Sequence, residues 1–403
     1  MPKKKNIFSS LHKFNKKIAI YNKYGEKKTY AELLKDSDYL SGFFDTKKVI
    51  IIFSDNSYEF IVCHIAATRS NLVSIFINPN INKKDLFELY KKYLPEYIFC
   101  KKKTDLFGKY KKILNLFDFS LFKIKKSHRY SINSELSCLL TTSGTTGESK
   151  YVKLSRENIL SNTTGISKLL NIKSNDTAIT TMPPYYSYAL SIINTHLMNG
   201  SKIIINDFSI IDKKFWILFN KLKPNNLNGV PYTYEILNKI NFEKMKISNL
   251  KYITQAGGKL DDGIKNKLIN LCEEKKIKFY VMYGQAEASP RISIMPANLI
   301  TKFPRSVGNP MPGGEVWVED DKNKKVLKRN FQGNLVYKGK NVFLGYSHSY
   351  KDLGKKNEMK NTLKTGDLGF IDKNGLIYIT GRKKRISKIF GIRISLDLLE
   401  NEL

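Results

Sequence analysis

The amino-acid sequence predicts an α/β protein that combines two helix-covered, mainly parallel β-sheets with a small antiparallel, β-barrel-like subdomain. Three observations favour this fold class. Short apolar runs alternate with helical patterns along most of the chain, these runs are continuously apolar, and the pattern changes after about residue 304. The 403 residues are too many for one simple core, and the 41% hydrophobic content is ample for a large one.

The alternation of apolar runs and helical patterns defines the expected elements before residue 304. Buried strands are expected at 49–53, 72–78, 138–142, 177–181, 202–206, 250–255 and 278–282. Helices are expected at 57–69, 83–92, 156–170 and 261–275. Strands that are apolar on both faces need helices on both faces, so parallel sheets covered on two sides follow from this pattern.

The region from about 305 to 380 has short strand signals without long helices between them. Strands are expected at 316–319, 334–337, 369–372 and 376–380. Asn374-Gly375 lies between the last two and is a strong hairpin signal. Residues 381–388 are expected to form a polar, basic connector, and a helix is expected to begin within 396–403.

The strong positive charge limits the classes of partner. The formal net charge is +33, from 69 Lys and Arg against 36 Asp and Glu. Such a charge favours an anionic partner, but the lysines are spread along the whole chain and no nucleic-acid-binding motif accompanies them. We therefore expect no specific nucleic-acid binding, although the positive field would favour anionic substrates such as ATP.

Cysteines and apolar runs argue against a metal cluster and a membrane span. Cys63, Cys100, Cys138 and Cys272 are far apart and have no metal-ligand spacing. No apolar run is long enough to span a bilayer, and no cleavable leader pattern follows the basic N-terminus. The sequence therefore predicts a cytoplasmic protein without a transmembrane segment.

A Ser/Thr/Gly-rich string between a predicted strand and a predicted helix is the strongest chemical motif. It reads Leu-Thr-Thr-Ser-Gly-Thr-Thr-Gly-Glu-Ser-Lys over residues 140–150. Glycines let backbone N–H groups turn toward an anion, hydroxyls add donors, and a lysine adds a positive charge. The candidate phosphate-binding residues are Thr142, Ser143, Gly144, Thr145, Thr146, Gly147 and Lys150.

Four further motifs follow in chain order, and each is a weak signal by itself. They are Gln-Ala-Gly-Gly at 255–258, Tyr-Gly-Gln-Ala-Glu at 283–287, Thr-Gly-Asp at 365–367 and the basic string Gly-Arg-Lys-Lys-Arg-Ile-Ser-Lys at 381–388. Together with the first string, these motifs resemble those of the adenylate-forming (AMP-binding) superfamily, in acyl-CoA-synthetase-like order and spacing. The resemblance extends from about Lys28 to Leu403.

The resemblance implies ATP and Mg²⁺ as cofactors and a role for each motif. Lys150 and the hydroxyl-rich string would hold the phosphates, and Gly257 and Gly258 would line the adenine and acyl pockets. Tyr283 and Gly284 would contact adenine, and Glu287 would bind Mg²⁺. Asp367 and Arg382 would bind the ribose or phosphate, and Lys388 would act in thioester formation.

Three positions depart from the superfamily pattern. Ser149 replaces the usual Pro and Tyr151 the usual Gly, which affects the stiffness of the loop more than its charge. Ala286 replaces a Thr whose hydroxyl would bind the α-phosphate. Losing that donor costs about 1–3 kcal/mol of phosphate or transition-state stabilisation.

The implied reaction activates a carboxylic acid with ATP to give an acyl-adenylate and then transfers the acyl group to a thiol of CoA or a carrier protein. By resemblance, residues 1–380 form the AMP-binding domain and 381–403 the hinge and the start of a truncated C-terminal domain. The hinge residue would be Lys384, and only 403 − 384 = 19 residues follow it. Two alternatives therefore stay open: a nucleotide-binding pseudoenzyme, or half of a split ligase with the C-terminal domain in trans.

The expected substrate is a small, plain carboxylic acid. Relatives that activate amino acids place an Asp in the pocket segment, and residues 182–190 contain no acidic side chain. Five tyrosines lie in or near the expected pocket segments and are either pocket-lining or core residues, namely Tyr185, Tyr186, Tyr188, Tyr232 and Tyr234.

Overall fold

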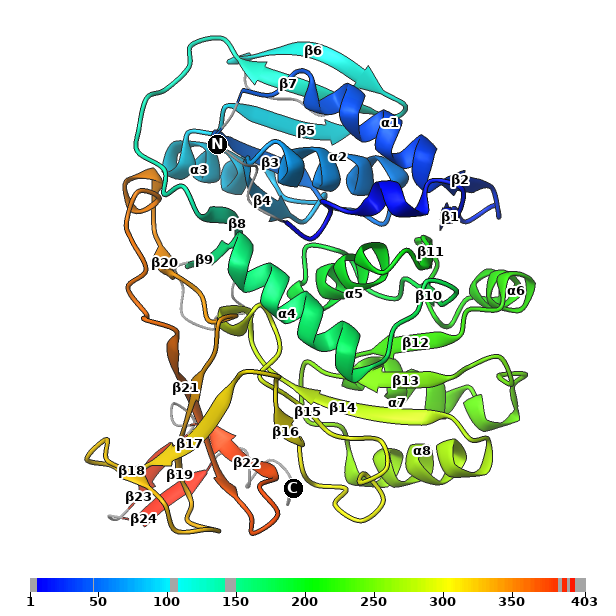
Figure 1. Ribbon diagram of the computed structural model, residues 1–403, viewed down its shortest axis with the longest axis vertical. Coiled ribbons are helices and arrows are strands. Elements are labelled where there is room, and N and C mark those ends of the chain that lie inside the picture. Colours follow the sequence, from blue (N-terminus) through cyan, green and yellow to red (C-terminus); the bar gives the residue numbers. More distant parts are fainter. Residues whose placement is uncertain are drawn as a thin grey trace.

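Two large sheets, one above the other in Figure 1, form the body of the protein in the computed structural model. The structure describes residues 6–45, 47–101, 108–141 and 150–382, and the backbone of 386–389 and 392–395. A smaller sheet extends from the lower left of the view, and helices separate and cover the large sheets. In the described ranges, no helix combines the length and apolar character needed to cross a bilayer.

The upper sheet has eight strands in the order β20-β9-β8-β4-β3-β5-β7-β6. Their bounds are β3 Val49–Phe53, β4 Val73–Ile77, β5 Tyr97–Lys101, β6 Tyr110–Leu116, β7 Phe119–Ile124, β8 Leu136–Thr141, β9 Tyr151–Ser155 and β20 Gly345–Ser347. The four central strands are parallel, and the strands on either side of them pair antiparallel. The expectation of a mainly parallel sheet is thus correct for its centre.

Helices cover both faces of this sheet, as the apolar strands predict. Ile50 and Ile52 of β3 pack in one core cluster with α2 (Tyr58–Arg69), whereas Val49 and Ile51 pack in another with α3 (Lys83–Tyr93). Alternate residues of a strand point to opposite faces, which explains the two clusters. The helix α1 (Tyr30–Ser41) begins at Thr29, whose side chain forms a capping box with Glu32.

The lower sheet has nine strands in the order β16-β15-β14-β13-β12-β10-β11-β1-β2, of which those from β14 to β1 are parallel. Their bounds are β1 Ile18–Tyr21, β2 Lys27–Thr29, β10 Thr177–Ile179, β11 Lys202–Ile204, β12 Asn226–Gly229, β13 Tyr252–Gln255, β14 Lys278–Tyr283, β15 Ser293–Ile294 and β16 Asn309–Pro310. The associated helices are α4 Arg156–Leu169, α5 Ser187–Met198, α6 Lys213–Leu222, α7 Pro231–Lys239 and α8 Asp262–Glu274. Short 3₁₀ helices are η1 Leu11–Phe14, η2 Phe242–Lys244, η3 Ala286–Ala288 and η4 Tyr350–Asp352.

The small sheet is antiparallel, as predicted, but its described strands form an open sheet rather than a barrel. Its order is β18-β17-β19-β21-β22, so β18 and β22 are at its edges. The bounds are β17 Glu315–Glu319, β18 Lys325–Val326, β19 Gly333–Lys338, β21 Thr362–Ile371 and β22 Ile377–Arg382. The Asn374-Gly375 turn joins β21 to β22, and Gly375 has φ +79°, a conformation that favours glycine.

The expected connector at 381–388 is wrong in part. Gly381 and Arg382 belong to β22, and 386–388 belong to β23 (Ile386–Ile389), which pairs with β24 (Ile392–Ser395). Isoleucines in both strands favour β structure despite the basic character of the segment. The helix expected within 396–403 lies outside the described residues.

Candidate nucleotide-binding site

Two neighbouring parallel strands bring the Gly-Gly motif and Tyr283 to the same edge of the lower sheet. Gln255 of β13 pairs with Val281 of β14, so both chains leave the sheet side by side. Gly257 has φ +90°, and both glycines are exposed. Ligands of parallel sheets bind at the carboxyl ends of the strands, so this edge is where a nucleotide is expected.

Tyr283, Asp367 and Arg382 form the first cluster at this edge. The Tyr283 hydroxyl donates to Asp367 Oδ2 at 2.5 Å, and Arg382 Nε donates to Oδ1 at 3.2 Å. Burial, with the Asp367 charge second, raises the pKa of Tyr283 well above its usual value, so this hydroxyl stays protonated as a donor. A carboxylate has about four acceptor sites, and acceptance of hydrogen bonds from a ribose by Asp367 stays a prediction.

The backbone after Tyr283 is tightly packed. A Cβ added to Gly284 would lie 1.8 Å from the Pro290 carbonyl oxygen and 2.9 Å from Arg291 Cα. The chain therefore needs glycine at 284 because another backbone segment crosses it, whether or not a ligand is bound. Contact of Gly284 with adenine stays a prediction.

Glu287, Tyr346 and Lys150 form the second cluster. Glu287 lies on η3 with 9% of its surface exposed, and its Oε1 accepts a hydrogen bond of 2.8 Å from the Tyr346 hydroxyl. Lys150 Nζ lies 6.0 Å from the centre of the Tyr346 ring. Tyr346 is on β20, which pairs with β9 directly after Lys150, and this pairing joins the end of the phosphate string to the Glu287 region.

The Glu287 carboxylate fits a divalent cation. No Lys or Arg among the described residues forms an ion pair with it, and its second oxygen has no protein donor there. Across the same residues there is no group of three or more His, Cys, Asp or Glu that could hold a metal. Mg²⁺ binds through one or two carboxylates together with substrate phosphates, so one carboxylate is enough.

Part of the predicted site lies outside the described residues. This applies to Thr142, Ser143, Gly144, Thr145, Thr146 and Gly147, and to the side chain of Lys388 on β23. The two ends of the string are nevertheless defined, since Thr141 pairs with Tyr151 in the β8–β9 hairpin. The string is therefore anchored beside Tyr346, and its contacts with phosphate stay a prediction.

The family of the chain follows from a comparison with protein-family models. Residues 7–347 match the model of the AMP-binding enzyme family. The chain belongs to this family. The match includes the first three sequence motifs, up to Glu287, and the β20 strand that carries Tyr346.

Known members of the family resemble this chain at moderate identity. The medium-chain fatty-acid–CoA ligase of Escherichia coli is 28% identical over 272 residues, which cover 67% of this chain and 47% of that protein. The 2-succinylbenzoate–CoA ligase of Bacillus cytotoxicus is 27% identical over 252 residues, covering 62% and 50%. The chain thus spans about half the length of these curated relatives.

A solved structure shows the same fold. It is the o-succinylbenzoate CoA synthetase of Bacillus subtilis in complex with its acyl-adenylate intermediate, with a TM-score of 0.79 and 17% identity over 97% of this chain and 80% of that one. The predicted α/β fold of the adenylate-forming enzymes is confirmed by this likeness, apart from the closed barrel.

Two side chains near the site were not among the predicted site residues of this AMP-binding chain. Tyr346 occurs in the sequence Gly-Tyr-Ser, and no neighbouring residue in the sequence indicates its contact with Glu287. Arg291 is 3% exposed and packs on the Tyr188 ring. Its signal in the sequence is a lone arginine within an otherwise uncharged run, Ala-Ser-Pro-Arg-Ile-Ser-Ile, which is unusual for a buried segment.

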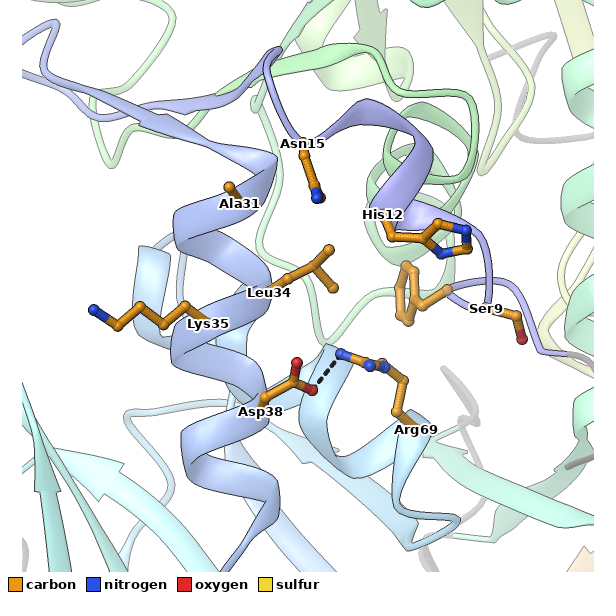
Figure 2. Close-up of a pocket in the computed structure, with 9 residues that line it drawn as sticks. Ser9, His12, Asn15, Ala31, Leu34, Lys35, Asp38 and Arg69 are labelled. Atoms are coloured by element: carbon orange, nitrogen blue, oxygen red, sulfur yellow. Dashed lines mark ion pairs between the residues drawn. The ribbon is translucent and has the colours of Figure 1, made fainter.

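A separate cavity of about 350 Å³ lies between η1, α1 and the end of α2 (Figure 2). Its lining includes His12, Leu34 and an ion pair of 2.6 Å between Arg69 Nη1 and Asp38 Oδ1. Because Asp38 neutralises Arg69, the pair presents no net charge to a ligand. None of the predicted nucleotide-site residues lines this cavity.

Proposed function

We propose that this protein activates a carboxylic acid with ATP to give an acyl-adenylate and pyrophosphate, and then transfers the acyl group to a thiol. The observation that carries the proposal is the meeting of two clusters around one strand end. Tyr283, Asp367 and Arg382 meet at the start of the segment 283–287, and Glu287, Tyr346 and Lys150 lie together at its end. Membership of the AMP-binding enzyme family supports the same reaction.

In the first half-reaction the protein positions its substrates and offsets charge. Asp367 accepts hydrogen bonds from the ribose hydroxyls, Tyr283 packs against adenine, and Arg382 contacts the ribose or phosphate. Lys150 and the hydroxyl-rich string hold the phosphates, including the leaving pyrophosphate. Mg²⁺, when bound at Glu287, supplies further neutralisation of phosphate charge. Positioning and preorganised charge account for most of the rate enhancement in phosphoryl and nucleotidyl transfer.

In the second half-reaction a thiol attacks the acyl carbon and AMP leaves. CoA is the favoured acceptor because the curated relatives are CoA ligases, and a carrier-protein thiol is the other candidate. Lys388 is proposed to act in this step. The acid itself is a carboxylic acid rather than an amino acid, since the pocket segment 182–190 has no carboxylate to hold an amine.

A second candidate function is nucleotide binding without efficient catalysis by this chain alone. Ala286 favours it, because the side chain lacks the hydroxyl that would contact the α-phosphate. The same behaviour would result if catalysis needed a C-terminal domain supplied in trans.

Carboxylate-dependent release of pyrophosphate tests the proposal. The chain is incubated with MgATP and a panel of carboxylic acids, and wild type is compared with Lys150→Ala and with Lys338→Ala, which removes an exposed lysine on β19 as a control. We expect release that depends on the acid, is reduced about 100-fold or more in Lys150→Ala, and is unchanged in Lys338→Ala. No release with any acid, while MgATP still binds in calorimetry, would support the second candidate instead.

A further inference from the structure

A buried guanidinium lies among the segments that the sequence predicts around the acyl group. Arg291 is 3% exposed, and its Cζ lies 4.3 Å from the centre of the Tyr188 ring. Its Nε donates to Met282 Sδ at 3.1 Å. Met282 directly precedes Tyr283, so the guanidinium is beside the strand end that carries the nucleotide site.

Tyr188 connects this guanidinium to the other pocket segments. It lies in the first turn of α5, within the predicted pocket segment at 182–190. Its hydroxyl lies within hydrogen-bond distance of the Thr254 side chain at 2.6 Å and of the Thr254 carbonyl oxygen at 3.1 Å, directly before the Gln255-Ala-Gly-Gly motif. The cation thus packs against the tyrosine that joins α5 to the end of β13.

The position of Arg291 is fixed by the backbone. Its carbonyl oxygen accepts from Asn162 Nδ2 at 3.1 Å and from Asn341 Nδ2 at 2.7 Å. Gly284 packs against its Cα on the other side. These contacts hold the backbone, and the side chain is held by the Tyr188 ring and Met282 Sδ. The guanidinium therefore has little freedom left to lose when a ligand binds.

The charge of Arg291 is not balanced by a carboxylate of the described residues. Burial lowers the pKa of its guanidinium to about 10, so the group is still protonated at neutral pH. A buried cation is strongly unfavourable unless it is paired. The Tyr188 ring compensates in part through a cation–π interaction, and methionine sulfur is only a weak acceptor.

We propose that Arg291 binds a second anionic group on the substrate, so that the acid activated here is a dicarboxylic acid or a related acid with a distal anion. The geometry that supports this is a fixed, buried guanidinium on the Tyr188 ring, next to Met282 and without a carboxylate partner in the described chain. One substrate carboxylate reacts at the nucleotide site, and the other pairs with the guanidinium. This inference rests on the proposed function and names its substrate class.

Binding of stable adenylate analogues tests this inference without turnover. Two acyl-sulfamoyl adenosines are compared by calorimetry: one ends in a free carboxylate, and the other carries the same chain as its methyl ester. We expect wild type to bind the carboxylate form at least about tenfold more tightly, since the charge pair is buried. Arg291→Met, which keeps length and loses charge, removes this preference, and Arg291→Lys retains part of it. Arg305→Met removes an exposed guanidinium and serves as the control.

Each outcome separates the two levels of the proposal. Equal binding of both analogues by wild type, or tighter binding of the ester, overturns the role of Arg291 and leaves the proposed function in place. This comparison uses wild type alone and holds even if the Arg291 variants do not fold. Absence of binding for both analogues and for AMP would overturn the proposed function itself.

Discussion

Two clusters of the candidate site hold an arginine in opposite environments. The cluster of Tyr283, Asp367 and the exposed Arg382 is named the mouth, and the buried cluster of Tyr188, Met282 and Arg291 is named the floor. At the mouth, Arg382 is 67% exposed and shares the Asp367 carboxylate with Tyr283. At the floor, Arg291 is 3% exposed and contacts an aromatic ring and a sulfur. At the mouth, a carboxylate of the chain neutralises the cation. At the floor, no carboxylate of the described residues does so, and the proposed partner is an anionic group of the ligand.

Gly284→Ala is expected to have the largest effect, because it displaces both clusters at once. The new Cβ would meet the Pro290 carbonyl at 1.8 Å, so the backbone between Tyr283 and Arg291 must move. We expect a loss of at least about 3 kcal/mol in the free energy of unfolding, measured by denaturant titration. Gly375→Ala is the control, since its Cβ meets nothing within 4 Å and only the φ of +79° is unfavourable, which costs about 1 kcal/mol. Equal losses in the two variants would contradict the crossing at Gly284.

Asp367→Ala isolates the mouth of the site. The variant removes the acceptor proposed for the ribose hydroxyls and for Arg382 Nε, and hydrogen bonds to a charged group contribute about 1.5–3 kcal/mol each. We expect AMP affinity in calorimetry to fall about 100-fold. Asp372→Ala is the matched control directly after the same strand, where the carboxylate accepts from the backbone N–H groups of Asn374 and Leu376 in the hairpin. That variant should lower stability and leave AMP affinity unchanged, and a similar fall in affinity in both variants would argue against a ribose contact.

Tyr346→Phe tests whether a neutral donor orients Glu287. The change deletes the hydroxyl that donates to Oε1 and keeps the ring near Lys150. Partners of metal ligands typically contribute about 10-fold or more to metal affinity, so we expect a rise of about tenfold in the Mg²⁺ concentration that supports half-maximal ATP binding. Tyr337→Phe removes a buried hydroxyl that donates to Asn341 and should leave this concentration unchanged. An unchanged Mg²⁺ requirement in Tyr346→Phe would separate Tyr346 from the metal site.

His64 is a buried base that is neutral at pH 7, whereas the buried Arg291 keeps its charge. Burial lowers the pKa of His64 from 6.5 to about 4, partly opposed by its hydrogen bond to Asn194. The unfolded chain takes up this proton near pH 6.5 and the folded chain only near pH 4, so stability falls as the pH decreases through this window. From pH 7 to pH 6 the contribution is about 0.7 kcal/mol.

Denaturant unfolding at these two pH values, compared between wild type and His64→Gln, measures this contribution. The pH dependence should be smaller in the variant, whereas His12→Gln, which changes an exposed histidine, should match wild type. A His64→Gln variant with the pH dependence of wild type would show that His64 is not held neutral by burial.

Several elements could be predicted because the signals that specify them are local. The run of β-branched residues at Val49–Phe53 is a strand with the predicted bounds. Thr29 and Glu32 are three residues apart, and together they begin α1. The Asn374-Gly375 turn is set by the φ that glycine allows. In each case neighbours in the sequence are neighbours in space, so the pattern contains the information.

The parts that were missed depend on strands that are distant in the chain. Tyr346 contacts Glu287 because β20 joins the edge of β9, and no local pattern specifies such a pairing. The small sheet was predicted to be antiparallel and barrel-like, and its described strands are antiparallel with open edges at β18 and β22. Closure of a sheet depends on the register and pairing of its edge strands, which no local pattern specifies. Helix α5 was missed because most of its residues are buried, which weakens the helical period. Helix α6 was also missed, although its buried residues Phe215, Leu218 and Phe219 have helical spacing.

The sequence by itself determined the family motifs, their order and the chemistry that each can perform, since these depend on residue types at short spacing. Only the tertiary structure decided how they combine. Tyr283 and Asp367 are 84 positions apart and are joined by a hydrogen bond of 2.5 Å. The burial of Arg291 against Tyr188 likewise results from packing between β14, α5 and the segment after η3. Burial is a property of the assembled fold. A buried cation without a carboxylate partner is unfavourable, and this is the physical reason for proposing that Arg291 binds an anion.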